Sequence, residues 1–239
     1  MNTIKHTSES RGTANFGWLQ SRHTFSFGRY YNPERVNFGA LRVLNDDIVT
    51  AGMGFGAHPH DNMEIVSIPL SGDLEHKDST GNTEVIRTGD VQIMSAGHGL
   101  THSEYNHSKS NEVNFLQIWV LPKERDIEPR YQQITFSPEG RKNQWQTVVA
   151  PDNDQVLWIN QDSWFSLADL DARMELAYAL KKEGNGVYVF VIEGEVTVNS
   201  EELKKRDALG ITGAEVINFS ATKDARLLLI EVPMIKSPF

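Results

Sequence analysis

Short runs of β-branched and aromatic residues recur along the whole chain. Examples lie at residues 40–44, 64–68, 113–120 and 187–192, and turn residues such as Ser71-Gly72-Asp73 bound them. Such runs predict strands, and no stretch keeps a helical period for more than two or three turns. Many short strands with frequent turns predict an all-β fold, built as a sandwich or barrel with a few short helices.

The two halves of the chain resemble each other weakly. An apolar run ends at Gly72, and Asp90 follows it by 18 residues at the start of another predicted strand. A second apolar run ends at Gly194, and Asp207 follows it by 13 residues, again before a strand. This echo predicts two similar barrels in tandem.

A polar segment at 122–144 separates the two halves. It contains three prolines, Pro122, Pro129 and Pro138, and such a composition is typical of a linker. We therefore expect an N-terminal domain over 1–130, and a linker with a C-terminal domain over 131–239.

The charge and the missing cysteines exclude several classes of function. The formal net charge of -9 argues against direct binding of nucleic acid, and the one short basic cluster, Lys204-Lys205-Arg206, runs into Asp207 and predicts a turn. The absence of cysteine excludes disulfides and thiolate metal sites. The first residues lack an apolar core of signal-peptide type, and no run is long enough to cross a membrane. We expect a cytoplasmic protein without a membrane partner.

The distribution of histidine is the most informative feature for function. All eight histidines lie before residue 108. His58-Pro59-His60 places two imidazoles at i and i+2, which point to one face of a strand, and His102-Ser103-Glu104 repeats this spacing with a carboxylate. Two such strands facing each other would offer three nitrogens and one oxygen, a set that suits a first-row divalent metal. For His6 and His107 we expect an ordinary surface position or a hydrogen-bonded place in the core.

These residues also resemble known motifs. Gly52, His58-Pro59-His60, Glu64 and Gly72 look like the first cupin motif, and Gly89, Ser95-Ala96-Gly97, His102 and Asn106 look like a stretched second one. More specifically, the chain resembles the pirin family. The blocks that carry the resemblance are His23-Thr24-Phe25-Ser26-Phe27, the run 41–47, the run 58–64, Met94-Ser95-Ala96-Gly97-His98-Gly99, and His102-Ser103-Glu104.

The resemblance implies a bicupin fold with a metal in the N-terminal barrel alone. It implies His58, His60, His102 and Glu104 as the ligands, whereas cupins in general use the glutamate of the first motif. That residue, Glu64, is expected here to support the ligands from outside. The internal repeat agrees, because the offsets of the four ligands fall on Leu180, Lys182, Phe219 and Ala221 in the second half.

Several residues keep two interpretations. His98 either lines the pocket entrance or is simply exposed. His23 and His76 either support the ligands, as metal-bound histidines require, or are ordinary polar residues at strand ends. The aromatic residues near the site are expected mainly in the core, with one or two of them in the wall of a substrate pocket: Trp18, Phe25, Phe27, Phe38 and Phe55.

The leading hypothesis for function follows from the resemblance. Bacterial pirins imply a metal-dependent dioxygenase that opens the central ring of a flavonol such as quercetin with O₂, and Glu104 is the candidate base. We expect one divalent transition metal per chain, with iron first and nickel, cobalt, manganese, copper or zinc open. The alternatives are a non-enzymatic, metal- or redox-sensing regulator that binds a protein partner, and a metal-dependent isomerase or stress-linked protein with another aromatic substrate. We expect a monomer.

Overall fold

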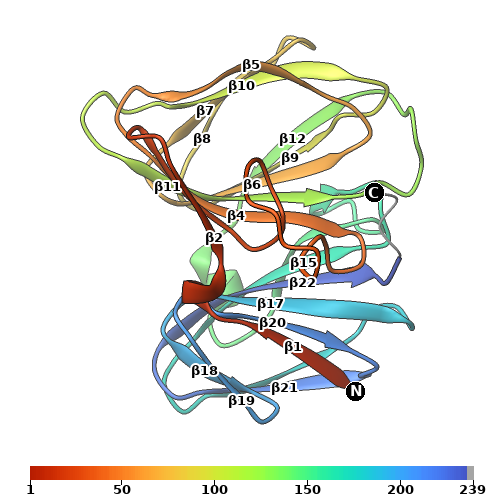
Figure 1. The fold of residues 1–239 in the computed structure, drawn as a ribbon. Helices are drawn as coiled ribbons and strands as arrows, with labels where there is room; N and C mark the ends of the chain where they lie inside the picture. Colours follow the sequence, from red (N-terminus) through yellow and green to blue (C-terminus); the bar gives the residue numbers. More distant parts are fainter. Residues whose placement is uncertain (236–239) are drawn as a thin grey trace.

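The computed structural model describes residues 1–235 and consists of four stacked layers of β-sheet (Figure 1). Two seven-stranded sheets lie in the centre, and a four-stranded sheet covers the outer side of each. The helices of the described residues are two short 3-10 turns, η1 (Ser8–Ser10) and η2 (Pro138–Arg141). The predicted all-β fold with two barrels is confirmed. Within residues 1–235, no helix is long and apolar enough to cross a membrane.

The N-terminal barrel combines one large and one small sheet. The order of its large sheet is β12 (Arg130–Thr135), β9 (Asp90–Ser95), β6 (Glu64–Ser71), β11 (Val113–Val120), β4 (Leu41–Val49), β3 (Leu19–His23) and β2 (Gly12–Asn15). The order of its small sheet is β5 (Gly54–His60), β10 (Leu100–Asn106), β7 (Leu74–Asp78) and β8 (Thr83–Ile86).

The C-terminal barrel repeats this plan. Its large sheet has the order β1 (Asn2–His6), β20 (Ala208–Thr212), β17 (Asn185–Glu193), β22 (Ala225–Pro233), β15 (Trp164–Leu170), β13 (Gln146–Ala150) and β14 (Leu157–Trp158). Its small sheet has the order β16 (Glu175–Ala179), β21 (Val216–Ala221), β18 (Glu195–Val198) and β19 (Glu201–Lys204).

The echo between the two halves corresponds to equivalent strands. β6 and β17 occupy the same place in their sheets, and so do β9 and β20. The two aspartates of the echo also make the same local contact. Asp90 accepts a hydrogen bond from the backbone N–H of Arg87 at 2.8 Å, and Asp207 accepts one from the N–H of Lys204 at 3.0 Å. Each carboxylate thereby closes the turn that leads into its strand.

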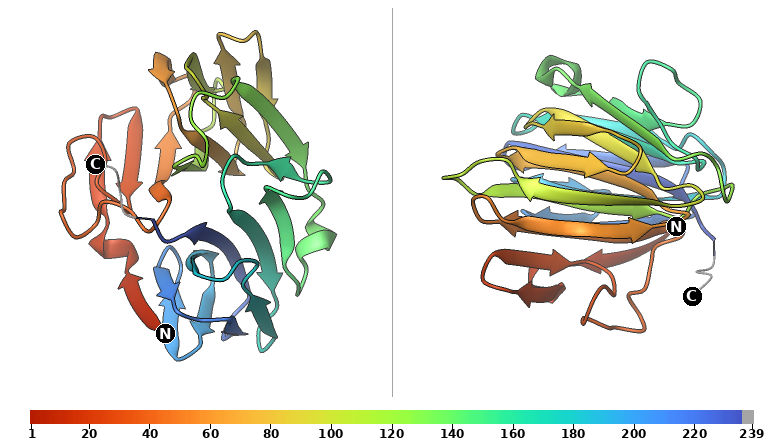
Figure 2. Two further views of the ribbon diagram at one scale, coloured as in Figure 1. Left: turned by 90° about the vertical axis from the view of Figure 1, so that its right-hand side faces the viewer. Right: turned by 90° about the horizontal axis from the view of Figure 1, so that it is seen from above.

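The edge strands of the two large sheets are exchanged. β1 precedes the N-terminal barrel in the chain but pairs with β20 of the C-terminal barrel, as the red N-terminal strand beside the blue strands shows (Figure 2). β12 lies inside the segment 122–144, which the sequence predicts to be a linker, yet it pairs with β9 of the N-terminal barrel. The prediction of a plain linker is wrong, because one edge of β9 is free for β12 to pair with. The domain boundary at residue 130 stays a prediction.

The interiors of the two barrels differ. Both large sheets contribute to one apolar core between them, which includes Val66, Ile118, Phe165, Phe190 and Leu228. The C-terminal barrel is filled by a second continuous apolar cluster. The N-terminal barrel holds only two smaller clusters, one around Phe115 and one around Ile65. Its remaining interior holds a cavity lined by aromatic and polar side chains, so this barrel has room for a site.

Candidate metal centre

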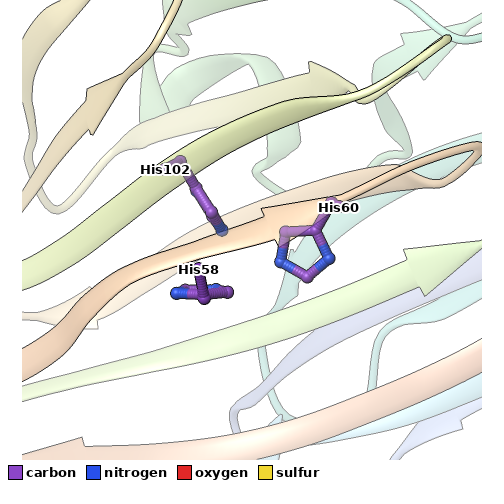
Figure 3. A group of neighbouring side chains, drawn as sticks. All are labelled: His58, His60 and His102. Carbon is purple, nitrogen blue, oxygen red and sulfur yellow. The ribbon is translucent and has the colours of Figure 1, made fainter.

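Strands β5 and β10 pair antiparallel and bring three imidazoles together. His58 lies opposite His102, and His60 follows two residues later along β5. The ring centroids of His58 and His102 are 4.5 Å apart, and His60 lies 4.9 Å from each of them. Figure 3 shows the three rings converging from the two strands. The period-two alternation along each strand places them on one side of the sheet.

In His58 and His60, the Nε2 atom is available to bind a metal. The Nδ1 atom of His58 lies 2.8 Å from the carbonyl oxygen of Gly56. Because a carbonyl only accepts, Nδ1 must carry the hydrogen, and the Nε2 atom of His58 keeps its lone pair. The Nε2 atom of His60 is buried and has no hydrogen-bond partner in the described part of the chain.

The third ring, His102, is oriented by a chain of two further residues. His76 places its Nε2 atom 2.9 Å from a carboxylate oxygen of Asp78 and its Nδ1 atom 3.5 Å from Nδ1 of His102. Burial alone would raise the pKa of Asp78, but hydrogen bonds, from Thr80 and then from His76, hold it below its usual value. The ionised Asp78 accepts from Nε2 of His76, whose Nδ1 then accepts from His102. The Nε2 atom of His102 is buried without a partner.

Two histidines of the cluster, His60 and His102, are held in the neutral form. Burial, and then the charge of His58, lower the pKa of His60 to about 4. Burial, and then the charges of His58 and His60, lower the pKa of His102 far below its usual range. A neutral imidazole has the lone pair that a metal ligand needs.

Glu104 lies on β10 beyond a break in the regular pairing. The register with β5 shifts between His102 and Glu104, so that Glu104 pairs with Phe55. Its carboxylate accepts hydrogen bonds from Oγ of Ser67 at 3.2 Å and from Nε2 of Gln117 at 2.9 Å, both from the large sheet. Burial raises the pKa of Glu104 to about 7, although these two hydrogen bonds act in the opposite direction.

The structure brings three of the four expected ligands into one group. One nitrogen of each of His58, His60 and His102 lies within 4.8 Å of the others. A carboxylate oxygen of Glu104 forms a second group of the same size with His102 and His76. Glu104 therefore lies near both His102 and His76, and His102 belongs to both groups.

Glu64 does not support these ligands, so that expectation is wrong. Its carboxylate accepts from Oγ of Ser95 at 2.8 Å and from the backbone N–H of Asn160 at 3.0 Å. Residues 64 and 67 of β6 point to opposite faces because side chains alternate along a strand. Ser67 faces Glu104 in the barrel, whereas Glu64 faces the second barrel. Burial raises the pKa of Glu64 to about 6.

The remaining histidines lie outside the cluster. His6 is buried and places Nδ1 2.7 Å from the hydroxyl of Tyr188, and His107 is exposed and lies 3.1 Å from a carboxylate oxygen of Glu75. Both match the expectation of ordinary positions. His98 is also exposed and does not line the cavity beside the cluster, which decides between its two interpretations.

A cavity of about 660 Å³ extends from the cluster into the N-terminal barrel. His58 and Glu104 line it together with aromatic side chains, among them Phe27, Phe55 and Trp119. The indole N–H of Trp119 is buried without a partner, and its ring packs edge-on against His60 with centroids 5.0 Å apart. The volume and the apolar walls are typical of a site for a small aromatic molecule.

The aromatic residues selected from the sequence divide as expected. Phe27 and Phe55 line the cavity, and Phe25 and Phe38 belong to the core between the barrels. Trp18 packs edge-on against Phe55, with ring centroids 5.3 Å apart.

The second barrel has apolar residues at the equivalent positions. The pairing of β16 with β21 places Tyr178 opposite Ile217 and Leu176 opposite Phe219. Aligned by this register, Tyr178, Leu180, Ile217 and Phe219 stand where the first barrel has His58, His60, His102 and Glu104. The fixed offsets taken from the sequence were wrong by two residues at all four positions, because the connections differ in length. Neither alignment finds a set of ligands.

Sequence reasoning missed Ser67 and Gln117. Each is a polar residue inside an otherwise apolar strand, in Ile65-Val66-Ser67-Ile68 and Phe115-Leu116-Gln117-Ile118. A buried polar group needs a partner, so a polar residue within an apolar strand was the feature of the sequence that could have indicated them. His76 was among the candidates, and the structure supports its role as a partner of His102.

Comparison with known proteins identifies the family. The model described as Pirin matches residues 5–120, and that of the quercetinase C-terminal cupin domain matches residues 147–232. The quercetin 2,3-dioxygenase of Escherichia coli (strain K12) is 42% identical over 233 residues, which cover 95% of this chain and 97% of that protein. The chain belongs to the pirin family. This pirin is also 38% identical to a pirin-like protein of Caulobacter vibrioides, over 92% of its length and 95% of the relative.

A solved structure supports the same assignment. The bacterial pirin YhhW from Escherichia coli, in complex with nickel(II), is similar to this pirin with a TM-score of 0.93 and 39% sequence identity. The similarity covers 98% of this chain and 100% of that one. The family predicted from the sequence blocks is confirmed.

The hydrogen bonds predict the tautomers of two histidines in this pirin. In metal-free protein, the neutral forms of His58 and His102 should carry their hydrogen on Nδ1, because Gly56 and His76 accept from that atom. Long-range ¹⁵N–¹H spectra of histidine-labelled protein measure this directly. A hydrogen on Nε2 of His102 would show that His76 does not orient it.

Proposed function

We propose that this pirin binds one divalent transition metal through His58, His60, His102 and Glu104. The observation that carries the proposal is the convergence of three imidazoles whose Nε2 atoms make no hydrogen bond within residues 1–235. Three nitrogens and one carboxylate oxygen fit several first-row metals, so this donor set does not select iron over nickel, cobalt, manganese, copper or zinc. The family relationship to YhhW, whose structure was solved in complex with nickel(II), supports the binding of a transition metal.

We further propose that the chain is a dioxygenase that opens a flavonol such as quercetin with O₂. The cavity beside the cluster supports this, because its aromatic walls and its volume suit a planar molecule of three rings. The names of the relatives at 42% identity support the same reaction class. A flavonol carries a 3-hydroxyl next to a 4-carbonyl, and these two oxygens would face the histidine cluster.

Glu104 is proposed to take the proton of the 3-hydroxyl. It lines the cavity, and Ser67 and Gln117 hold both of its oxygens in place. A bound divalent metal would acidify a coordinated hydroxyl and spread its negative charge. The aromatic walls keep bulk water away from the anion that results, which then reacts with O₂. His76 acts through His102 and is a positioning residue.

The metal content of two variants tests the ligand set. Wild-type protein should hold about one ion per chain, because the second barrel has apolar residues at the equivalent positions. Glu104→Ala should weaken metal binding by more than the about 10- to 100-fold typical of losing an outer partner. Glu64→Ala should leave it unchanged, because Glu64 faces the other barrel. Elemental analysis and chelator competition measure both, and the reverse ranking, or two tightly bound ions, would contradict the assignment.

Oxygen uptake by two further variants tests the enzymatic role. Glu104→Gln keeps the shape and an oxygen but not the basicity, so it should bind metal and quercetin and lose about 10²- to 10⁴-fold in turnover. Glu104→Asp keeps the base with a shorter reach and should be intermediate. If the Gln variant keeps full uptake, Glu104 is not the base. If metal-loaded wild type consumes no oxygen with any flavonol, the dioxygenase proposal fails and the regulator becomes the better hypothesis.

A further inference from the structure

A patch of four buried polar side chains lines the cavity away from the histidine cluster. Ser21 and His23 come from β3, and Asn45 and Asp47 come from the neighbouring strand β4. Ser21 pairs with Asp47 across the strands, and His23 pairs with Asn45. The proposed metal site uses none of them, although at most 5% of each residue is exposed.

The hydrogen bonds within this patch leave one carboxylate oxygen without a donor. The Nδ1 atom of His23 lies 3.0 Å from the amide oxygen of Asn45 and 3.3 Å from the hydroxyl of Ser21. Oδ1 of Asp47 is buried and has no hydrogen-bond partner among residues 1–235. Burial raises the pKa of Asp47 to about 7, and a hydrogen bond from Ser21 offsets only part of this effect. A buried carboxylate that lacks a donor destabilises a fold, so its presence in a cavity wall needs an explanation.

The sheet geometry sets the separation of the backbone of Asp47 from that of Gln117, the residue that holds Glu104. Gln117, which holds Glu104, lies opposite Asn45 on the adjacent strand, and Asp47 is two residues further along β4. One strand spacing and two residues correspond to about 8 Å. This is comparable to the separation of hydroxyls at opposite ends of a flavonol. The aromatic ring of Phe115, opposite Asp47 on β11, provides an apolar surface for the ring between them.

We infer that Asp47 is a specificity-determining residue that accepts a hydrogen bond from a phenolic hydroxyl at the end of the substrate remote from the histidine cluster. The inference rests on the proposed function and names a property that the metal site alone does not give. The substrate class is then a flavonol with further hydroxyls on an outer ring. A flavonol with only the 3-hydroxyl and 4-carbonyl would bind without this contact.

Anaerobic binding of two flavonols to metal-loaded protein tests the inference. Quercetin carries outer-ring hydroxyls, and 3-hydroxyflavone lacks them but keeps the pair of oxygens that faces the cluster. Asp47→Asn should weaken quercetin binding about 10- to 100-fold, the range expected for a hydrogen bond to a charged group, and should change the Kd of 3-hydroxyflavone less than about twofold. Titration calorimetry at pH 8 measures both. Flavonols that each lack one hydroxyl then identify the ring that Asp47 contacts.

Asp46→Asn is the matched control. Asp46 is adjacent in sequence but points to the other face of β4, where it pairs with Arg206 at 3.2 Å, and neither Kd should change. Thermal unfolding tests whether Asp47→Asn folds. Its melting temperature should be equal to that of wild type or higher, because the substitution removes a buried charge. Asp47→Ser is a second variant for the same binding test. If the Asp47 variants bind both flavonols equally more weakly, or bind both as tightly as wild type does, the role of Asp47 is overturned and the proposed function is not. Metal-loaded wild type that binds neither flavonol overturns the proposed function, and this inference with it.

Discussion

The site depends on the antiparallel pairing of two short outer strands, β5 and β10. Their register places His58 opposite His102, and the period of two places His60 beside them. The regular alternation along β10 keeps Glu104 on the same face as His102, and Ser67 and Gln117 of the large sheet hold its carboxylate there. A slip of one residue would move the histidines to the outer face of the sheet. The neighbouring strand β7, through His76 and Asp78, fixes the orientation of His102.

The two barrels divide stability and chemistry between them. Buried polar groups lower stability unless each finds a partner, and the N-terminal barrel contains several without one, among them Nε2 of His60 and Oδ1 of Asp47. The C-terminal barrel has the same strand plan with an apolar interior in which Phe219 occupies the place of Glu104. The shared core between the large sheets, and the exchanged edge strands β1 and β12, join the two. We infer that the second barrel stabilises the first barrel, whose own stability is lowered by its unpartnered buried polar groups.

The sequence predicted most of the fold and the three imidazoles, because alternation along strands is local information. The pairing partners are not local. The register shift at Glu104 follows from hydrogen bonding between β5 and β10, and the contacts of Ser67 and Gln117 join strands that are far apart in the chain. Fixed offsets misplaced the equivalents in the second barrel because loops of different length separate the same strands. The role expected for Glu64 came from other cupins, and the alternation of β6 excludes it here.

The most direct test of the central claim is anomalous diffraction from crystals of this pirin loaded with one transition metal. The account predicts one strong peak per chain. The Nε2 atoms of His58, His60 and His102 should lie about 2.0–2.2 Å from it, and an oxygen of Glu104 should be the fourth ligand. A peak bound instead by His76 would contradict the ligand assignment, as would a second peak of similar strength in the C-terminal barrel.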